Sequence, residues 1–308
     1  MLPYIKGKFG NAKITVVCQE HIRELYEYCP AVDDVITSPS ERSGGWGNEL
    51  RHKEVLNRIK AKNPDILLNS ILSTHRLSDM KGLDFIPKRY AFRNFCEIKY
   101  TNLISTRAES KSELDHHCDF LGGLGIVVDS LTPQMWLTNN DRVFALKTFQ
   151  HFNIDPKKTI VLFVGTRENI KIYDRCGDVL KEVCKEFEYN VVTVGTSREY
   201  KMNQHCLDVI GRGINLSGKL TIRQIAAVIE KCQLTVGPDT GFSHIACAVQ
   251  TSNVVIFGGN EGYRFFPYSN LTTLVSIFNG NDIVKNVKSI PPNIITKAIK
   301  KVLSNLRV

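Results

Sequence analysis

The sequence contains no apolar run long enough to cross a bilayer. Runs such as residues 160–164 (IVLFV) and 254–257 (VVIF) have the length of β-strands, whereas a membrane-spanning helix needs about 20 apolar residues in succession. The opening residues, MLPYIKGKFGNAK, contain no apolar stretch of the kind that marks a secretory signal. We therefore expect a cytoplasmic protein.

Paired cysteine motifs are also absent. The nine cysteines form an odd number, and no two of them have C-x-x-C spacing. Most lie in apolar stretches, where a free thiol packs as a small hydrophobic side chain, so we expect reduced core residues. The run from His116 to Asp119 (HHCD) lies in a helical pattern, in which adjacent side chains point in different directions. We expect neither a metal site nor a cofactor.

No arginine-rich tract with interleaved aromatic residues is present, although the net charge is +9. The basic residues are spread along the chain, and no nucleic-acid-binding motif is recognisable. A positive field favours an anionic partner such as a nucleotide, a phosphorylated glycan or an anionic membrane surface. It is equally typical of an ordinary solvated surface, so charge alone does not choose a partner. We expect no nucleic-acid partner.

Strand-like and helix-like segments alternate along the 308 residues, which predicts an α/β fold with mostly parallel sheets. The length suits two domains of about 150 residues each. Residues 139–158 have the pattern of a helix followed by a polar connection, so we place the boundary near residue 150. We expect two facing Rossmann-like domains, 1–150 and 151–308, with ligands at the carboxyl ends of their strands.

The individual elements are clearer in the second half. In the first half we expect strands at 12–18, 33–39 and 63–71 and helices at 21–29, 49–62 and 112–126. In the second half we expect strands at 159–165, 189–195, 233–237 and 252–259 and helices at 172–187, 222–232, 242–249 and 294–306. The last helix has lysines on one face and apolar residues on another. This pattern is typical of a helix packed on its own domain, with peripheral membrane contact as the alternative.

The segment of greatest chemical interest is Gly-Pro-Asp-Thr-Gly, residues 237–241, which joins a buried strand to a helix. Unpaired N–H groups and the positive end of the helix dipole meet there, which favours an anion site. Thr240 can offer a hydroxyl, and Gly241 allows a phosphate to approach the backbone. His244 lies on the first helical turn and can point toward the same ligand. The alternative is that Asp239 or Thr240 is a plain helix N-cap.

The wider context favours the anion site. Residues 216–248, LSGKLTIRQIAAVIEKCQLTVGPDTGFSHIACA, resemble glycosyltransferase family 9, the ADP-heptose:lipopolysaccharide heptosyltransferases and their relatives, with the D-T-G-x-x-H signature intact. The segment VLFVGTRENIKIYDR is similar to the family's phosphate-contacting loop and places Thr166 and Lys171 at its donor-facing positions. The segment GGNEGYRFFP is similar to a loop near the nucleotide and adds Asn260 and Arg264. Before residue 150 the resemblance is looser.

The resemblance implies an inverting bacterial glycosyltransferase of GT-B fold that moves a heptose-like sugar from an ADP-linked donor to a glycan or lipopolysaccharide-type acceptor. It assigns catalytic roles to Lys171 and Asp239 and donor contacts to Thr166, Thr240, Gly241, His244, Asn260 and Arg264. Lysine, hydroxyl and amide groups would share the charge of the leaving diphosphate. Lys171 could instead be an ordinary surface lysine and His244 a buried structural histidine. Asp239 could contact the donor or orient His244.

Family members begin with a strand and a Gly-Asp pair whose aspartate, by resemblance, is the general base. The present sequence opens with Met1-Leu2-Pro3, at a position inside the family's first helix. One hypothesis is that the sequence starts at an internal methionine. The other is a short form that binds the donor but transfers poorly. A nucleotide- or glycan-binding paralogue and another GT-B enzyme, such as a UDP-sugar epimerase-like protein, are the alternative functions.

Overall fold

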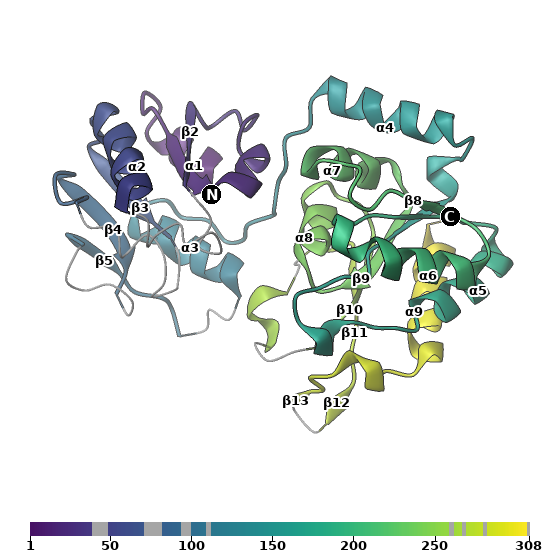
Figure 1. Cartoon of the computed structure of the whole chain (residues 1–308). Coiled ribbons are helices and arrows are strands. Elements are labelled where there is room, and N and C mark those ends of the chain that lie inside the picture. The colour runs from purple at the N-terminus through teal and green to yellow at the C-terminus, as the bar shows by residue number, and fades with distance from the viewer. Residues whose placement is uncertain are drawn as a thin grey trace. The chain divides into compact units, whose positions relative to one another are not determined.

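The chain divides into two compact units, Met1–Leu131 and Thr132–Val308 (Figure 1). The computed structural model describes residues 1–38, 49–70, 82–93, 100–108, 112–258, 262–266, 269–279 and 282–306. Within these residues the strands pair in parallel, apart from one short antiparallel pair, β12 (Phe278–Asn279) with β13 (Asp282–Ile283). The expected α/β class with mostly parallel sheets is confirmed.

The second unit begins before residue 150 because helix α4 (Asn139–His151) packs on helix α7 (Ile222–Lys231). The Arg142 guanidinium binds the Glu230 carboxylate, with 2.8 Å between Nη2 and Oε1. Arg223, which is 6% exposed, pairs with Asp141 and also donates to the carbonyl oxygen of Trp136. These contacts attach α4 to the second unit, so the division at residue 131 differs from the expected position near 150.

A six-stranded parallel sheet forms the centre of the second unit, in the order β11-β10-β9-β6-β7-β8. Its strands are β6 (Thr159–Leu162), β7 (Asn190–Thr193), β8 (Ile214–Asn215), β9 (Leu234–Pro238), β10 (Asn253–Ile256) and β11 (Thr272–Val275). The chain runs outward from β6 to β8, returns to β9 beside β6, and continues outward to β11. This is the doubly wound order of Rossmann folds, in which ligands bind where the order reverses. That point lies between β6 and β9.

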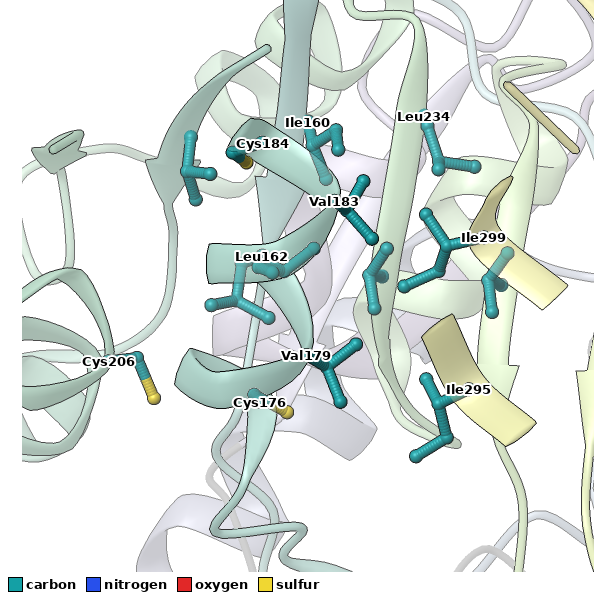
Figure 2. Close-up of a cluster of buried hydrophobic side chains, with 14 of the residues drawn as sticks. Ile160, Leu162, Cys176, Val179, Val183, Cys184, Cys206, Leu234, Ile295 and Ile299 are labelled. Carbon is teal, nitrogen blue, oxygen red and sulfur yellow. The ribbon is translucent and has the colours of Figure 1, made fainter. Parts of the chain in front are cut away.

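Helices cover both faces of this sheet. On one face, α5 (Cys176–Phe187), α6 (Tyr200–Ile210) and α9 (Pro292–Asn305) contribute to a buried cluster with alternate strand residues. Figure 2 shows part of it, including Ile160, Val183 and Ile299. On the other face, α4, α7 and α8 (Gly241–Ala248) pack against residues such as Val161. Strands covered on both faces carry continuous apolar runs, which is why β6 and β10 are wholly buried.

The apolar face of α9 lies inside its own unit. Ile295, Ile299 and Leu303 are completely buried in the cluster that α9 shares with α5. On the polar face, Lys300 binds Glu182 and Glu186 of α5 at 2.6 and 2.7 Å. The expected packing of this terminal helix on its own domain is confirmed. Among the described residues, no helix combines the length and the apolar character needed to cross a membrane.

The first unit contains two separate parallel ladders in its described residues. Strands β1 (Thr15–Gln19) and β2 (Asp34–Ser38) form one, and β3 (Ile66–Asn69), β4 (Lys88–Phe92) and β5 (Asn102–Ile104) form the other. Helices α1 (Leu2–Lys8), α2 (Glu49–Ala61) and α3 (Glu113–Gly123) accompany them. Its strands are less buried than β6. In β1, for example, Cys18 is buried and the other four residues are partly exposed. The apolar signal in this half of the sequence is correspondingly weaker.

Two expectations for the first unit can be compared with the structure. The helix expected at 21–29 is wrong: residues Glu20–Leu25 form the 3₁₀ segment η1, followed by turns. None of those six residues is buried, so no apolar face holds a longer helix in place. The cysteines that the structure describes are buried and free, as expected. No group of three metal-binding side chains occurs within the described ranges.

Candidate functional site

Five of the predicted site residues come from the ends of β6 and β9, on either side of the point where the strand order reverses. Thr166 follows β6, and Lys171 ends the short 3₁₀ turn η4 (Asn169–Lys171). Asp239 follows β9 directly, Thr240 is the N-cap of α8, and His244 lies on its first turn. Parallel strands bring their carboxyl ends to one edge of a sheet, so two distant segments of sequence meet here.

Asp239 is the centre of a cluster of charged and titratable side chains. The Lys171 ammonium lies 3.6 Å from Asp239 Oδ2 and 2.9 Å from Glu168 Oε1. On the other side, His244 Nε2 lies 3.8 Å from Asp239 Oδ1. The side chains of Lys171 and Asp239 are only 17% and 9% exposed. Lys171 is therefore not an ordinary solvated surface lysine, and the structure brings it together with Asp239 and His244. The catalytic and donor-binding roles of these residues stay predictions.

Burial shifts the titration of this cluster. It raises the pKa of the Asp239 carboxyl, while His244 and Lys171 act in the opposite direction. His244 keeps 44% of its side chain exposed, yet the protein surrounding its ring lowers its pKa, against the effect of Asp239. An imidazole with a pKa below its usual value is neutral at pH 7. Lys171 is the cationic side chain of the cluster.

The first turn of α8 presents backbone and hydroxyl groups at the same place. Thr240 has an extended backbone, and its side chain makes no capping hydrogen bond. Its Oγ1 atom is buried and has no hydrogen-bond partner within the described residues. The first amides of a helix lack intrahelical acceptors. A plain N-cap through the Thr240 side chain is therefore not what the structure contains, and its hydroxyl can meet a bound anion.

Three other predicted donor contacts are Thr166, Arg264 and Asn260. The Thr166 hydroxyl accepts a hydrogen bond from the Glu168 amide at 3.3 Å, within the loop that carries Lys171. The Arg264 guanidinium stacks on the Phe265 ring at 4.8 Å in the 3₁₀ turn η6 (Gly262–Phe265). Asn260 lies outside the described residues. The roles of Thr166, Arg264 and Asn260 remain predictions.

Glu199, which the sequence reasoning missed, brings a carboxylate to the same edge of the sheet. It ends the 3₁₀ turn η5 (Ser197–Glu199) after β7, and its Oε2 accepts a hydrogen bond from the Thr196 amide at 2.5 Å. A Cβ atom on Gly165 would overlap this carboxylate, and one on Gly195 would lie 2.6 Å from Oε2. In Rossmann units an acidic residue after the second strand binds ribose. Glu199 follows the second strand of this unit, β7, but no local motif in the sequence marks it.

A comparison with known proteins decides the family. The sequence profile of glycosyltransferase family 9 (heptosyltransferase) matches residues 109–291, more than half of the chain. The chain belongs to glycosyltransferase family 9. The matched range contains every described residue of the candidate site, and most of it lies in the second unit of this family 9 protein.

Individual relatives support the fold of this family 9 protein. Its sequence is 34% identical over 67 residues to the lipopolysaccharide core heptosyltransferase OpsX of Haemophilus influenzae, a match that spans 22% of this chain and 19% of that relative. The structure of a family 9 glycosyl transferase from Veillonella parvula is 19% identical, with a TM-score of 0.85 over 99% of this chain and 92% of that chain.

The Escherichia coli heptosyltransferase WaaC, solved with ADP-2-deoxy-2-fluoro heptose, is 15% identical to this chain. Its TM-score is 0.74 over 97% of this chain and 94% of that chain. These similarities confirm the expected GT-B class of two Rossmann-like units.

Proposed function

We propose that this family 9 protein is an inverting glycosyltransferase that moves a heptose-like sugar from an ADP-linked donor to a glycan or lipopolysaccharide-type acceptor. The observation that carries the proposal is the cluster of Lys171, Asp239 and His244 beside the N-terminus of α8. The cluster lies where a doubly wound sheet binds its ligands. The acceptor class is drawn from the lipopolysaccharide heptosyltransferase relatives.

The donor diphosphate would lie between Lys171 and the first turn of α8. A buried hydroxyl without a partner, on Thr240, and the helix amides at Gly241 can donate hydrogen bonds to phosphate oxygens. When the sugar leaves, negative charge develops on the diphosphate, and donors fixed in advance stabilise that charge more than they stabilise the intact donor. Lys171 would supply the full positive charge, and Asp239 would hold its ammonium and the His244 ring in place.

The nucleoside would extend from the diphosphate toward β7. Glu199 lies at that end, where its carboxylate can accept hydrogen bonds from ribose hydroxyls. The choice of adenine as the base follows the E. coli heptosyltransferase solved with ADP-2-deoxy-2-fluoro heptose. We place the reaction in the cytoplasm, where peripheral contact with the inner membrane surface would give access to a glycolipid acceptor.

The test is calorimetric titration with ADP, UDP and GDP, followed by an assay of ADP release from ADP-heptose in the presence of a lipopolysaccharide-core acceptor. We expect selective ADP binding that Asp239→Ala weakens and that Asp208→Ala, on the exposed side of α6, leaves unchanged. Binding of ADP without transfer would support the alternative of a nucleotide-binding paralogue. Equal binding by the parent protein and Asp239→Ala would contradict the site assignment.

A further inference from the structure

A completely buried asparagine lies behind the turn that carries Glu199. Asn203, on the first turn of α6, is 0% exposed. Its side-chain amide donates to the carbonyl oxygen of Val194 at 3.1 Å and to Ser217 Oγ at 2.6 Å. Val194 follows β7 and Ser217 follows β8, so one amide group joins the ends of two neighbouring strands. Buried polar groups with several partners fix one arrangement of the chain around them.

The segment after β8 is itself held tightly. Ser217 is 3% exposed, and its backbone amide donates to Asn215 Oδ1 at 3.1 Å. Asn215 in turn donates to the carbonyl oxygen of Tyr200 at 3.0 Å, at the start of α6. The Gly218 amide donates to the carbonyl oxygen of Gly195 at 2.8 Å. These bonds join α6 to the loops after β7 and β8, and among the described residues only Asn203 Oδ1 of this set is buried without a hydrogen-bond partner.

Close backbone contact adds to the network. Gly218 has φ +74, and a Cβ atom at this position would lie 2.8 Å from Ser197 Cα. Only glycine combines this backbone conformation with so near an approach. The turn at residues 195–199 is therefore held at Val194 by Asn203, which Ser217 binds in turn, and at Gly195 by the Gly218 amide. Within the turn, the Glu199 carboxylate accepts a hydrogen bond from the Thr196 amide.

We propose that Asn203 and Ser217 are positioning residues for nucleotide binding: together they fix the turn at residues 195–199 and hold the Glu199 carboxylate at the nucleoside end of the donor site. The inference rests on the proposed donor site. A turn that is ordered before the ligand arrives does not lose conformational entropy on binding, and the avoided entropy cost strengthens the affinity for the ligand. Neither residue reaches the ligand itself.

The expected effect is a loss of donor affinity that depends on Glu199. Loss of one buried hydrogen bond in the network corresponds to a factor of about 3 to 10 in affinity. Ser217→Ala and Asn203→Ala should both raise the dissociation constant of ADP, and in the transfer assay both should raise the donor KM more than they lower kcat. His205→Ala, at an exposed position of the same helix, is the matched control.

A double-mutant cycle with ADP as the probe separates positioning from general destabilisation. The four proteins are the parent chain, Ser217→Ala, Glu199→Ala and the double variant, each measured by calorimetry at a temperature well below its unfolding transition. We expect Ser217→Ala to weaken ADP binding in the parent chain and to have no further effect once Glu199 is alanine. Ser217→Ala, the milder change, keeps the test available if Asn203→Ala does not fold.

Two results would overturn the inference and leave the proposed function standing: equal effects of Ser217→Ala in both backgrounds, or ADP binding that Asp239→Ala weakens and Glu199→Ala does not. A parent chain that binds none of ADP, UDP and GDP would overturn the inference together with the proposed donor site. The calorimetric series therefore distinguishes the failure of one from the failure of both.

Discussion

Replacement of Lys171 by alanine removes the ammonium group that lies between two carboxylates at the candidate donor site. Its Nζ atom is 2.9 Å from Glu168 Oε1 and 3.6 Å from Asp239 Oδ2. In the variant, Asp239 keeps His244 as a neighbour, but the lowered pKa of His244 keeps the imidazole neutral at pH 7. The site would then present net negative charge to a diphosphate.

The magnitude follows from this geometry. Two unit charges 4 Å apart interact by about 4 kcal/mol at an effective dielectric constant of 20, which suits pairs near a protein surface. The Glu168 side chain is 48% exposed, so solvent screens part of this interaction. A hydrogen bond to a charged group contributes about 1.5–3 kcal/mol net. We therefore expect Lys171→Ala to weaken ADP binding by about 10- to 100-fold.

Calorimetric titration with ADP at fixed ionic strength measures this loss. Lys181→Ala, at an exposed position of α5, is the matched control for loss of one positive charge. The double variant Lys171→Ala/Asp239→Asn should recover part of the affinity, because it removes the carboxylate that Lys171→Ala leaves uncompensated. If Lys171→Ala binds ADP within twofold of the parent protein, the diphosphate does not meet Lys171 and the charge argument is refuted.

Three further outcomes are expected. As the pH falls below the ordinary histidine pKa of 6.5, His244 gains a proton, so ADP affinity measured by calorimetry should rise relative to that of His244→Gln; a constant ratio would contradict a role for the ring. Arg223→Ala should lower the free energy of unfolding in urea by about 3 kcal/mol, because it leaves Asp141 without its buried partner. Gly165→Ala should displace the Glu199 carboxylate and weaken ADP binding about tenfold, unlike Gly122→Ala, where a Cβ atom meets open space.

The central strands of the second unit could be predicted because they are buried on both faces. β6, β7 and β10 each fall within an expected strand, and β9 extends one residue past the strand expected at 233–237. A strand covered on both sides carries an uninterrupted apolar run. The start of α7 is equally clear: Thr221 and Gln224 form a capping box, and Ile225 to Ile229 are all buried.

Elements held by polar contacts could not be predicted in the same way. No helix was assigned to Tyr200–Ile210, where α6 lies. Its buried face includes the polar residue Asn203, whose partner Ser217 is 14 residues away. Asn203 interrupts the apolar periodicity that would otherwise indicate a helix. The unit boundary depends on Arg223 and Asp141, which are 82 residues apart in the sequence. A local pattern does not reveal such a pair.

The candidate site likewise has a part that could be predicted from local sequence and a part that could not. Asp239, Thr240 and His244 belong to one strand–loop–helix segment, so their proximity could be predicted from spacing. Glu199 could not be recognised from its surroundings in the sequence, because its carboxylate meets Gly165 only when β6 and β7 become neighbours in the sheet. The sequence therefore indicates the residues that one strand–loop–helix segment brings together. It does not indicate Glu199, which reaches the site only through the pairing of β6 with β7.

One segment, residues 216–244, connects these features. Near its start, Ser217 bonds to Asn203 and the Gly218 amide bonds to Gly195 beside the turn after β7. Its helix α7 holds α4 through Arg223, and its end presents Asp239 and His244 to Lys171. Each part is constrained by a different region of the second unit, so few residue types satisfy the contacts at each position. This explains in physical terms why the family resemblance is most specific in this segment, whereas the less buried strands of the first unit carry a looser one.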